Sequence, residues 1–356
     1  MMELQAVASQ QISDVTGAEA GYVISGASAG LTLGAAAILA GMDPGRMDRL
    51  PDTTGMKNEI ILAREHRNGY DHAIRLAGAK FVEIGMNEIV SGAGVRRTEA
   101  WEYEAAITDQ TAGIAYTVTP DSEPPLEQVV EVAHRHGLPV LVDAAGELPP
   151  ISNLKKFIGL GADLVAFSGG KSIRGPQSSG ILCGRRDLIA SAAVQHLDMD
   201  EFFDIWNPPE SLIPKGTLVG IPRHGIGRGF KVGKEEIVGL ITAIRVFLNE
   251  DEEAETARYT EMCRRAVDAL VEVPGVTVSL EHDGRDYLIP TAVVRFSEDW
   301  RGPTQAEILS ALSRGDPPVF VRTLGGPGEI GIDPINLDEE TLDIVVRRVR
   351  EGLLSQ

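Results

Sequence analysis

Two polar residues follow two apolar runs near the middle of the chain, and their types suggest chemistry on a carbonyl-bearing ring. Asp143 follows the run Pro139–Val142, and Lys171 comes 28 residues later in the sequence Ser168-Gly-Gly-Lys. A lysine amine can form an imine with an aldehyde. A buried carboxylate can hold a protonated ring nitrogen and keep that ring electron-withdrawing. Ligands in open α/β sheets bind at the carboxyl ends of the strands, so we expect Asp143 and Lys171 to lie together there.

Each residue also has an ordinary structural interpretation. A strand-end aspartate can cap the following helix or turn, and a lysine in a glycine-rich loop can simply be solvated. The pairing of the two favours function. We therefore expect Lys171 to be partly buried, with Ser168 and the adjacent glycines permitting close approach to a phosphate.

A turn of small residues, Gly26-Ala27-Ser28, joins a short strand that includes Val23 to an expected helix at Leu31–Ala40. The free N–H groups and positive dipole at a helix start suit a phosphate. Tight packing of a small-residue helix on a sheet is the alternative. A dinucleotide site is disfavoured because the Gly-x-Gly-x-x-Gly pattern is absent.

His66 follows the apolar run Glu59–Ala63, so we expect it at another strand end, where its imidazole could stack on a planar ring. Tyr70 could supply the stacking instead, or His66 could be a surface histidine bonded to its neighbours. Ala145 follows Asp143 closely and is considered below.

Basic residues gather before an expected helix at 231–249, and Arg228 and Lys231 are the best candidates there for binding an anion. Arg322 follows an expected strand at Pro318–Val321 and could hold a carboxylate through two parallel hydrogen bonds. Counter-ion pairs or structural salt bridges are the alternatives for all three.

The elements that must position these residues alternate between strand-like and helical patterns. Such alternation between about Val23 and Cys183 predicts βαβ units with a mostly parallel sheet whose two faces are covered by helices. We expect residues 1–249 to form a large α/β domain that carries the candidate site, and residues 250–356 to form a small α+β domain.

Length and composition allow an enzyme and exclude several other classes. The chain has 356 residues with a formal net charge of −19, so nucleic acid is an unfavourable partner. No apolar run is long enough for a membrane helix, and the first residues lack the pattern of a signal peptide. We therefore expect a soluble cytoplasmic protein. The two cysteines predict neither a disulfide framework nor a metal cluster.

The chain resembles the fold-type I enzymes that use pyridoxal 5′-phosphate (PLP), and within them the selenocysteine synthase-related (SelA-like) group that includes D-glucosaminate-6-phosphate ammonia-lyase. The phrases that carry this resemblance are Leu50-Pro-Asp-Thr, Met56-Lys-Asn-Glu, Val142-Asp-Ala-Ala-Gly-Glu147, Phe167-Ser-Gly-Gly-Lys171 and Gly227-Arg-Gly-Phe-Lys-Val-Gly-Lys-Glu-Glu236.

The resemblance implies PLP as cofactor and assigns roles to residues. Lys171 would form the Schiff base and Asp143 would bind the ring nitrogen. His66 and Ala145 would contact the two ring faces. The phosphate would lie on Gly26, Ala27, Ser28 and Ser168, and Arg228, Lys231 and Arg322 are candidates for the substrate.

Two departures from the group stand out. Gly146 occupies a position where relatives often have a side chain that bonds the phenolic oxygen of PLP. From the resemblance we also expect the chain to begin some tens of residues late and to lack the family's N-terminal arm, which would affect its substrate and activity.

The resemblance implies a homodimer or larger homo-oligomer that eliminates ammonia from a β-hydroxy amino acid or an amino sugar acid, phosphorylated or not, to leave a 2-oxo acid. PLP-dependent racemisation, aldol cleavage and transamination stay open. So do a selenocysteine synthase-like transferase without the tRNA-binding domain, a non-catalytic relative and a nucleotide-dependent oxidoreductase.

Overall fold

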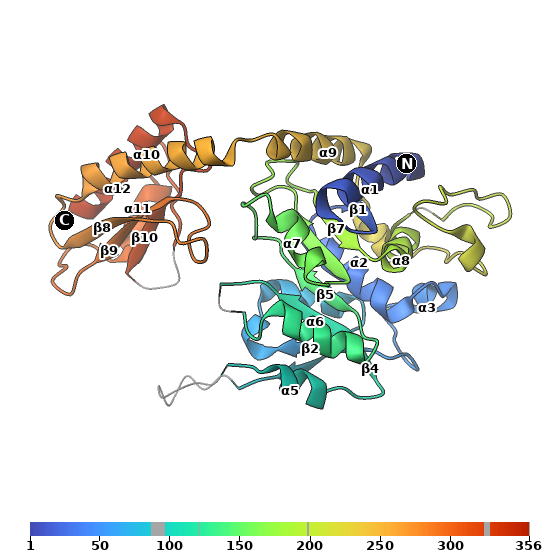
Figure 1. Cartoon of the computed structure of the whole chain (residues 1–356). Helices are drawn as coiled ribbons and strands as arrows, with labels where there is room; N and C mark the ends of the chain where they lie inside the picture. Colours follow the sequence, from blue (N-terminus) through green and yellow to red (C-terminus); the bar gives the residue numbers. More distant parts are fainter. Residues whose placement is uncertain (87–96, 121, 198, 324–327, 356) are drawn as a thin grey trace. The chain divides into compact units, whose positions relative to one another are not determined.

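The computed structural model describes residues 1–86, 97–120, 122–197, 199–323 and 328–355. The chain divides into two compact units, Met1–Asn249 and Glu250–Gln356. A seven-stranded sheet lies in the first unit and a three-stranded sheet in the second (Figure 1). The two units are described separately below.

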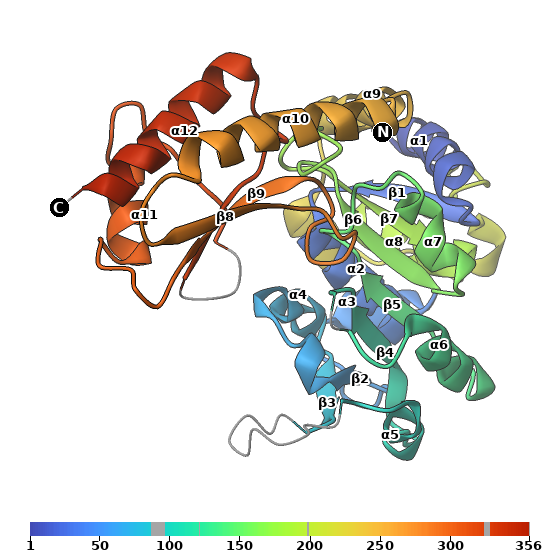
Figure 2. The same ribbon diagram turned by 60° about the vertical axis from the view of Figure 1, so that its left-hand side comes forward.

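The seven-stranded sheet has the order β1-β7-β6-β5-β4-β2-β3. The strands β3, β2, β4, β5 and β6 are parallel, whereas β7 is antiparallel to both of its neighbours. This arrangement confirms the prediction of a mostly parallel sheet, and Figure 2 shows β5 beside β4. The strands are β1 Ala20–Ile24, β2 Glu59–Ala63, β3 Lys80–Ile84, β4 Thr111–Thr117, β5 Val140–Asp143, β6 Leu164–Ser168 and β7 Gly180–Gly184.

Helices cover both faces of this sheet because successive strand residues point to opposite sides. Tyr22 and Ile24 belong to one apolar core, with α2 and α8, and Val23 belongs to the other, with α6 and α9. The helices of the first unit are α1 Met2–Thr16, α2 Ala27–Ala40, α3 Pro44–Arg49, α4 His72–Leu76, α5 Ala100–Ala105, α6 Leu126–Arg135, α7 Asn153–Gly159, α8 Arg186–His196 and α9 Lys234–Leu248.

The second unit packs helices on an antiparallel sheet of order β10-β9-β8. Its elements are α10 Glu252–Leu270, β8 Val276–Glu281, β9 Thr291–Phe296, α11 Gln305–Ser313, β10 Glu329–Ile332 and α12 Glu339–Leu354. The strand predicted at Pro318–Val321 is wrong, and the third strand is β10. Two consecutive prolines, Pro317 and Pro318, lack the N–H groups that a ladder needs.

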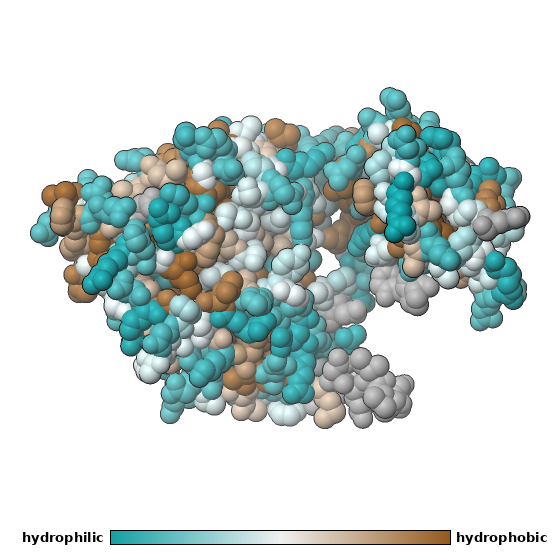
Figure 3. Space-filling model, turned by 180° about the vertical axis from the view of Figure 1, so that it is seen from behind, coloured by the Kyte–Doolittle hydropathy of each residue, from teal (hydrophilic) through white to brown (hydrophobic). Residues whose placement is uncertain are grey.

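Hydrophilic side chains cover much of the face drawn in Figure 3, with apolar patches among them. Within the described part of the chain, no helix combines the length and apolarity that a bilayer crossing would require. Cys183 and Cys263 are both free and buried, one in each unit.

Candidate functional site

The candidate residues gather where the parallel strands end. Cross-strand register places Thr117 of β4 opposite Asp143 of β5, and Asp143 opposite Ala166 of β6. Ser168 ends β6 two residues further on and pairs with Gly180, which in turn pairs with Ile24 at the end of β1. The loops that carry Lys171, the Gly26 turn and Asp143 therefore leave one edge of the sheet.

Asp143 is a half-buried carboxylate in an environment that disfavours its charge. Its Oδ1 accepts a hydrogen bond from the Ala145 N–H at 3.1 Å. Burial raises the pKa of Asp143, while the Ala145 N–H and the nearby charge of Lys171 lower it and only partly compensate. A cation held against this carboxylate would favour its charged form.

Lys171 is exposed rather than partly buried as expected. A Cβ atom built on Gly146 would lie 3.9 Å from its Nζ, so the amine stands next to the backbone that follows Asp143. Ser172 fixes this approach, because its Oγ donates to the Leu148 carbonyl at 2.5 Å. The two loops that follow β5 and β6 are thus bonded together beside the amine.

The glycines before Lys171 are required by the packing of their own loop. A Cβ on Gly169 would lie 2.4 Å from Ser179 Oγ, and one on Gly170 would lie 2.7 Å from the Cα of Gln177. The Gly169 N–H also donates to the Ser179 carbonyl at 2.9 Å. The Ser-Gly-Gly-Lys sequence therefore allows the loop to fold back tightly and present the lysine.

The small-residue turn before α2 has the predicted position at a helix start. Gly26 is the N-cap residue, with φ of 113°, and α2 begins at Ala27, so Ser28 lies in the first helical turn. A Cβ on Gly26 would meet nothing within 4 Å, which leaves the approach to the turn open. Below the turn, a Cβ on Gly180 would lie 3.0 Å from the Ala27 nitrogen, so β7 approaches closely because it begins with glycine.

His66 lies after β2 but points into the protein. It ends the short 3-10 helix η1, Arg64–His66, and is 1% exposed, with its ring edge-on to that of Tyr116 at 4.5 Å. Neither ring nitrogen has a hydrogen-bond partner, and burial lowers the pKa of His66 to about 4. Tyr70, the alternative stacking residue, is exposed. Stacking by His66 stays a prediction.

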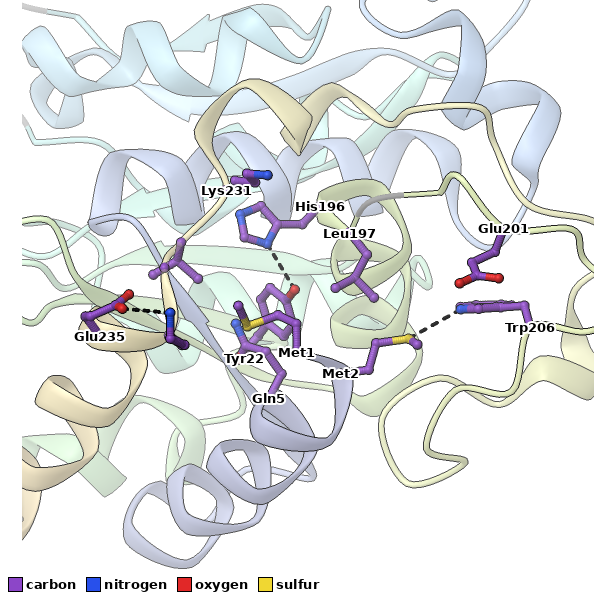
Figure 4. A pocket seen from close by; sticks show the side chains of 13 residues that line it. Met1, Met2, Gln5, Tyr22, His196, Leu197, Glu201, Trp206, Lys231 and Glu235 are labelled. Carbon is purple, nitrogen blue, oxygen red and sulfur yellow. Dashed lines mark hydrogen bonds and ion pairs between the residues drawn. The ribbon is translucent and has the colours of Figure 1, made fainter.

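Arg228 and Lys231 precede α9 rather than opening it, because α9 begins at Lys234. Arg228 lies in the 3-10 helix η4, Ile226–Phe230. Lys231 lines a cavity of about 440 Å³ together with Met2, Tyr22 and Trp206, and Figure 4 shows these side chains around it.

One backbone carbonyl ties this basic segment to the small-residue turn before α2. The carbonyl oxygen of Phe230 accepts from Ser25 Oγ at 2.8 Å and from His196 Nε2 at 3.0 Å. His196 Nδ1 then accepts from the Tyr22 hydroxyl at 2.9 Å, and burial lowers the pKa of His196. Ser25 directly precedes Gly26, so the chain of bonds fixes the residues after Arg228 against that turn.

Arg322 lies in the second unit and is exposed, outside any named strand. Its backbone forms an isolated antiparallel bridge with Gly331. In the ranges that the structure describes, no group of three or more histidine, cysteine or acidic side chains could hold a metal ion.

Glu147 is a member of the site that residue-by-residue reasoning missed. It is half-buried, and the charges of Asp143 and Lys171 both act on it. The available signal was its place four residues after Asp143, on the loop that leaves the same strand.

The sheet order, and a strand-end carboxylate beside a loop lysine, define the fold-type I architecture of PLP-dependent enzymes. Among solved structures, D-glucosaminate-6-phosphate ammonia-lyase matches with a TM-score of 0.76 and 27% identity, covering 99% of this chain and 86% of that one. The PLP-dependent protein YhfS from Escherichia coli matches in fold, with a TM-score of 0.60 and 16% identity over 99% of this chain and 86% of that one.

Sequence comparisons agree with this architecture. The sequence model of the L-seryl-tRNA selenium transferase family (SelA) matches residues 70–199. A 5′-C-glycyluridine monooxygenase-decarboxylase from a Streptomyces species is 30% identical, over 99% of this chain and 82% of its own length. D-glucosaminate-6-phosphate ammonia lyase of Salmonella typhimurium is 28% identical, over 96% of this chain and 83% of its own length. The chain belongs to the SelA-like family, as the resemblance implied.

Proposed function

We propose that this protein is a PLP-dependent lyase that converts a β-hydroxy amino acid or amino sugar acid, phosphorylated or not, to a 2-oxo acid and ammonia. The observation that carries the proposal is that Asp143 and Lys171 lie at the ends of two adjacent strands, close enough for their charges to interact. The similarity to an ammonia lyase over most of both chains supports the reaction type.

The residues present fit PLP by the chemistry of their groups. Asp143 is a half-buried carboxylate with a raised pKa, and a protonated pyridine nitrogen would supply the positive charge that favours its ionised form. The open turn at Gly26, Ala27 and Ser28, with Ser168 on the same sheet edge, offers N–H and hydroxyl donors to a phosphate. We infer that Ala145 and His66 would contact the ring, His66 after turning its unpartnered nitrogens outward.

PLP supplies, when bound, an electron-withdrawing ring that accepts the electron pair left at Cα. Lys171 would hold the cofactor through its amine and then, as a free amine, accept the Cα proton. Asp143 would keep the ring nitrogen protonated. Arg228 and Lys231 are the proposed anchors for anionic groups of the substrate, Arg322 of the second unit is proposed to bind a carboxylate, and a homodimer or larger homo-oligomer is the proposed assembly.

The first experiment identifies the covalent site. Protein incubated with PLP is reduced with borohydride and digested, and mass spectrometry is expected to find the pyridoxyl group on Lys171. Lys171→Ala protein should lose the label, while Lys155→Ala, which removes an exposed lysine on α7, should keep it. Full labelling of Lys171→Ala protein would overturn the proposal.

The second experiment identifies the reaction. D- and L-β-hydroxy amino acids and amino sugar acids are screened under anaerobic conditions for 2-oxo acid and ammonia in equal amounts. PLP-loaded protein that releases neither from any of them would contradict the lyase assignment.

A second candidate is oxidative decarboxylation, favoured by the similarity to the 5′-C-glycyluridine monooxygenase-decarboxylase. This reaction would consume O2 and release CO2, whereas elimination does neither. Parallel measurements with and without O2 therefore separate the two candidates.

A further inference from the structure

Glu147 lies on the loop that follows β5, and hydrogen bonds hold its backbone next to the loop that follows β6. The Glu147 N–H donates to the Ala144 carbonyl at 3.2 Å, and Asn153 Nδ2 donates to the Glu147 carbonyl at 2.7 Å. The next residue, Leu148, accepts the bond from Ser172 of the lysine loop. The previous residue, Gly146, adjoins the Lys171 amine. Glu147 is thus fixed beside the amine by bonds that leave its carboxyl group available.

The carboxyl group of Glu147 lies in a cluster of charges. Burial raises its pKa, Lys156 opposes this, the negative charge of Asp143 raises it further, and Lys171 opposes it. The net direction is upward, so a larger protonated fraction is present near neutral pH than for a solvated glutamate. A half-buried carboxylic acid next to a lysine base is the arrangement that acid–base catalysis on one substrate requires.

The proposed elimination needs a proton donor for its leaving group. The Cβ–O bond must break with its electron pair leaving on oxygen, and hydroxide is a poor leaving group unless it is protonated. Asp143 would be engaged with the ring nitrogen, and Lys171 would first act as the base that takes the Cα proton. The ammonium form of Lys171 and the carboxyl group of Glu147 are then the two groups that could supply the proton, and a separate acid lets the Cα–H and Cβ–O bonds break without one amine serving both.

We propose that Glu147 is the general acid that protonates the leaving β-hydroxyl group, an inference that rests on the proposed lyase function. The Cα–H bond breaks with its proton going to the Lys171 amine. The Cβ–O bond breaks with its electron pair going to oxygen, and the carboxylic acid of Glu147 gives that oxygen a proton, so water leaves. The Glu147 carboxylate then regains a proton from the Lys171 ammonium, directly or through solvent, which returns both groups to their starting forms before the next turnover.

The test varies the leaving group. Serine and β-chloroalanine, in the enantiomeric form that the wild type accepts, differ in that chloride leaves without a proton. Glu147→Gln keeps the size of the side chain and removes the acid. We expect kcat for serine to fall by about 10²- to 10⁴-fold, while kcat for β-chloroalanine stays near that of the wild type.

Three further measurements isolate the role. Exchange of the Cα proton with deuterium, followed by NMR, reports on Lys171 alone and should survive in Glu147→Gln, as should borohydride labelling. Glu147→Asp keeps an acid and should restore part of the activity on serine. Glu131→Gln, which neutralises an exposed acid on α6, should behave as the wild type with both substrates.

The outcomes separate the two proposals. An equal loss of activity on serine and β-chloroalanine in Glu147→Gln, or no loss on either, would overturn the acid role and leave the lyase function intact. A wild type that eliminates from neither compound, nor from any other β-hydroxy substrate, would instead overturn the lyase function itself. A misfolded Glu147→Gln variant would be recognised because borohydride would not label it with PLP. The Glu147→Asp variant then tests the acid role, which predicts a larger loss of kcat on serine than on β-chloroalanine.

Discussion

The buried imidazole of His66 should make the first unit sensitive to acid. His66 has two ring nitrogens without partners and a pKa of about 4, against about 6.5 for a solvated histidine. The folded state therefore holds this ring neutral, whereas the unfolded chain takes up a proton below pH 6.5. The neutral ring therefore contributes fully to the free energy of unfolding at pH 7, and this contribution is lost as the pH falls from about 6.5 towards about 4.

The magnitude follows from proton linkage. Between pH 7 and pH 5, the difference between the two pKa values lowers the free energy of unfolding by about 2 kcal/mol. The side chain is 1% exposed, so solvent screening reduces this value little. His66→Phe keeps a flat ring against Tyr116 and removes the titration. When the pH is lowered from 7 to 5, the free energy of unfolding of the wild type should therefore fall by about 2 kcal/mol more than that of His66→Phe.

The assay is urea unfolding of PLP-free protein at pH 7 and pH 5, with NMR titration of the histidine ring protons. His136→Phe is the control, because His136 is more exposed and pairs with Glu104 on the surface. Parallel pH dependence of the wild type and His66→Phe would refute the reasoning, as would a measured His66 pKa near 6.5.

Three other substitutions test the framework of the site. Gly180→Ala would press a methyl group on the Ala27 nitrogen, so PLP affinity measured by absorbance titration should fall, with a loss of stability of about 1 to 3 kcal/mol. Asp163→Ala removes a 5% exposed carboxylate that accepts bonds from a strand N–H, a histidine and an arginine. The histidine and arginine side chains are 47% and 43% exposed and stay hydrated, so the loss of the partner of the strand N–H should cost about 1 to 3 kcal/mol in urea unfolding. Tyr22→Phe leaves His196 Nδ1 without its donor and should lower the free energy of unfolding by about 1 to 3 kcal/mol, measured in the same way.

The large domain's strands could be predicted because their signals are local. The runs at Glu59–Ala63 and Pro139–Val142 lie within one residue of β2 and β5, since short β-rich segments between turns specify strands without tertiary information. The position of Asp143 beside the lysine loop followed from the geometry of parallel sheets. Each depended on one segment or on one general rule of topology.

The errors have tertiary causes. The start of α9 was placed at Lys231 rather than Lys234 because the sequence does not reveal that the Phe230 carbonyl accepts hydrogen bonds from Ser25, which follows β1, and from His196 of α8. Lys171 was expected to be partly buried, but its loop folds back on itself and presents the amine to solvent. The role of Glu147 depends on a bond between two loops, which no spacing predicts.

The Phe230 carbonyl has a mechanical consequence. A single oxygen accepts hydrogen bonds from both Ser25 and His196. The basic segment and the turn before α2 therefore cannot shift separately without breaking one of the two bonds. A phosphate that draws the turn towards itself would also pull on Phe230, and through it on Val232 and Gly233 at the head of α9. Occupancy at one end of α2 would then be transmitted to a helix on the opposite face of the sheet.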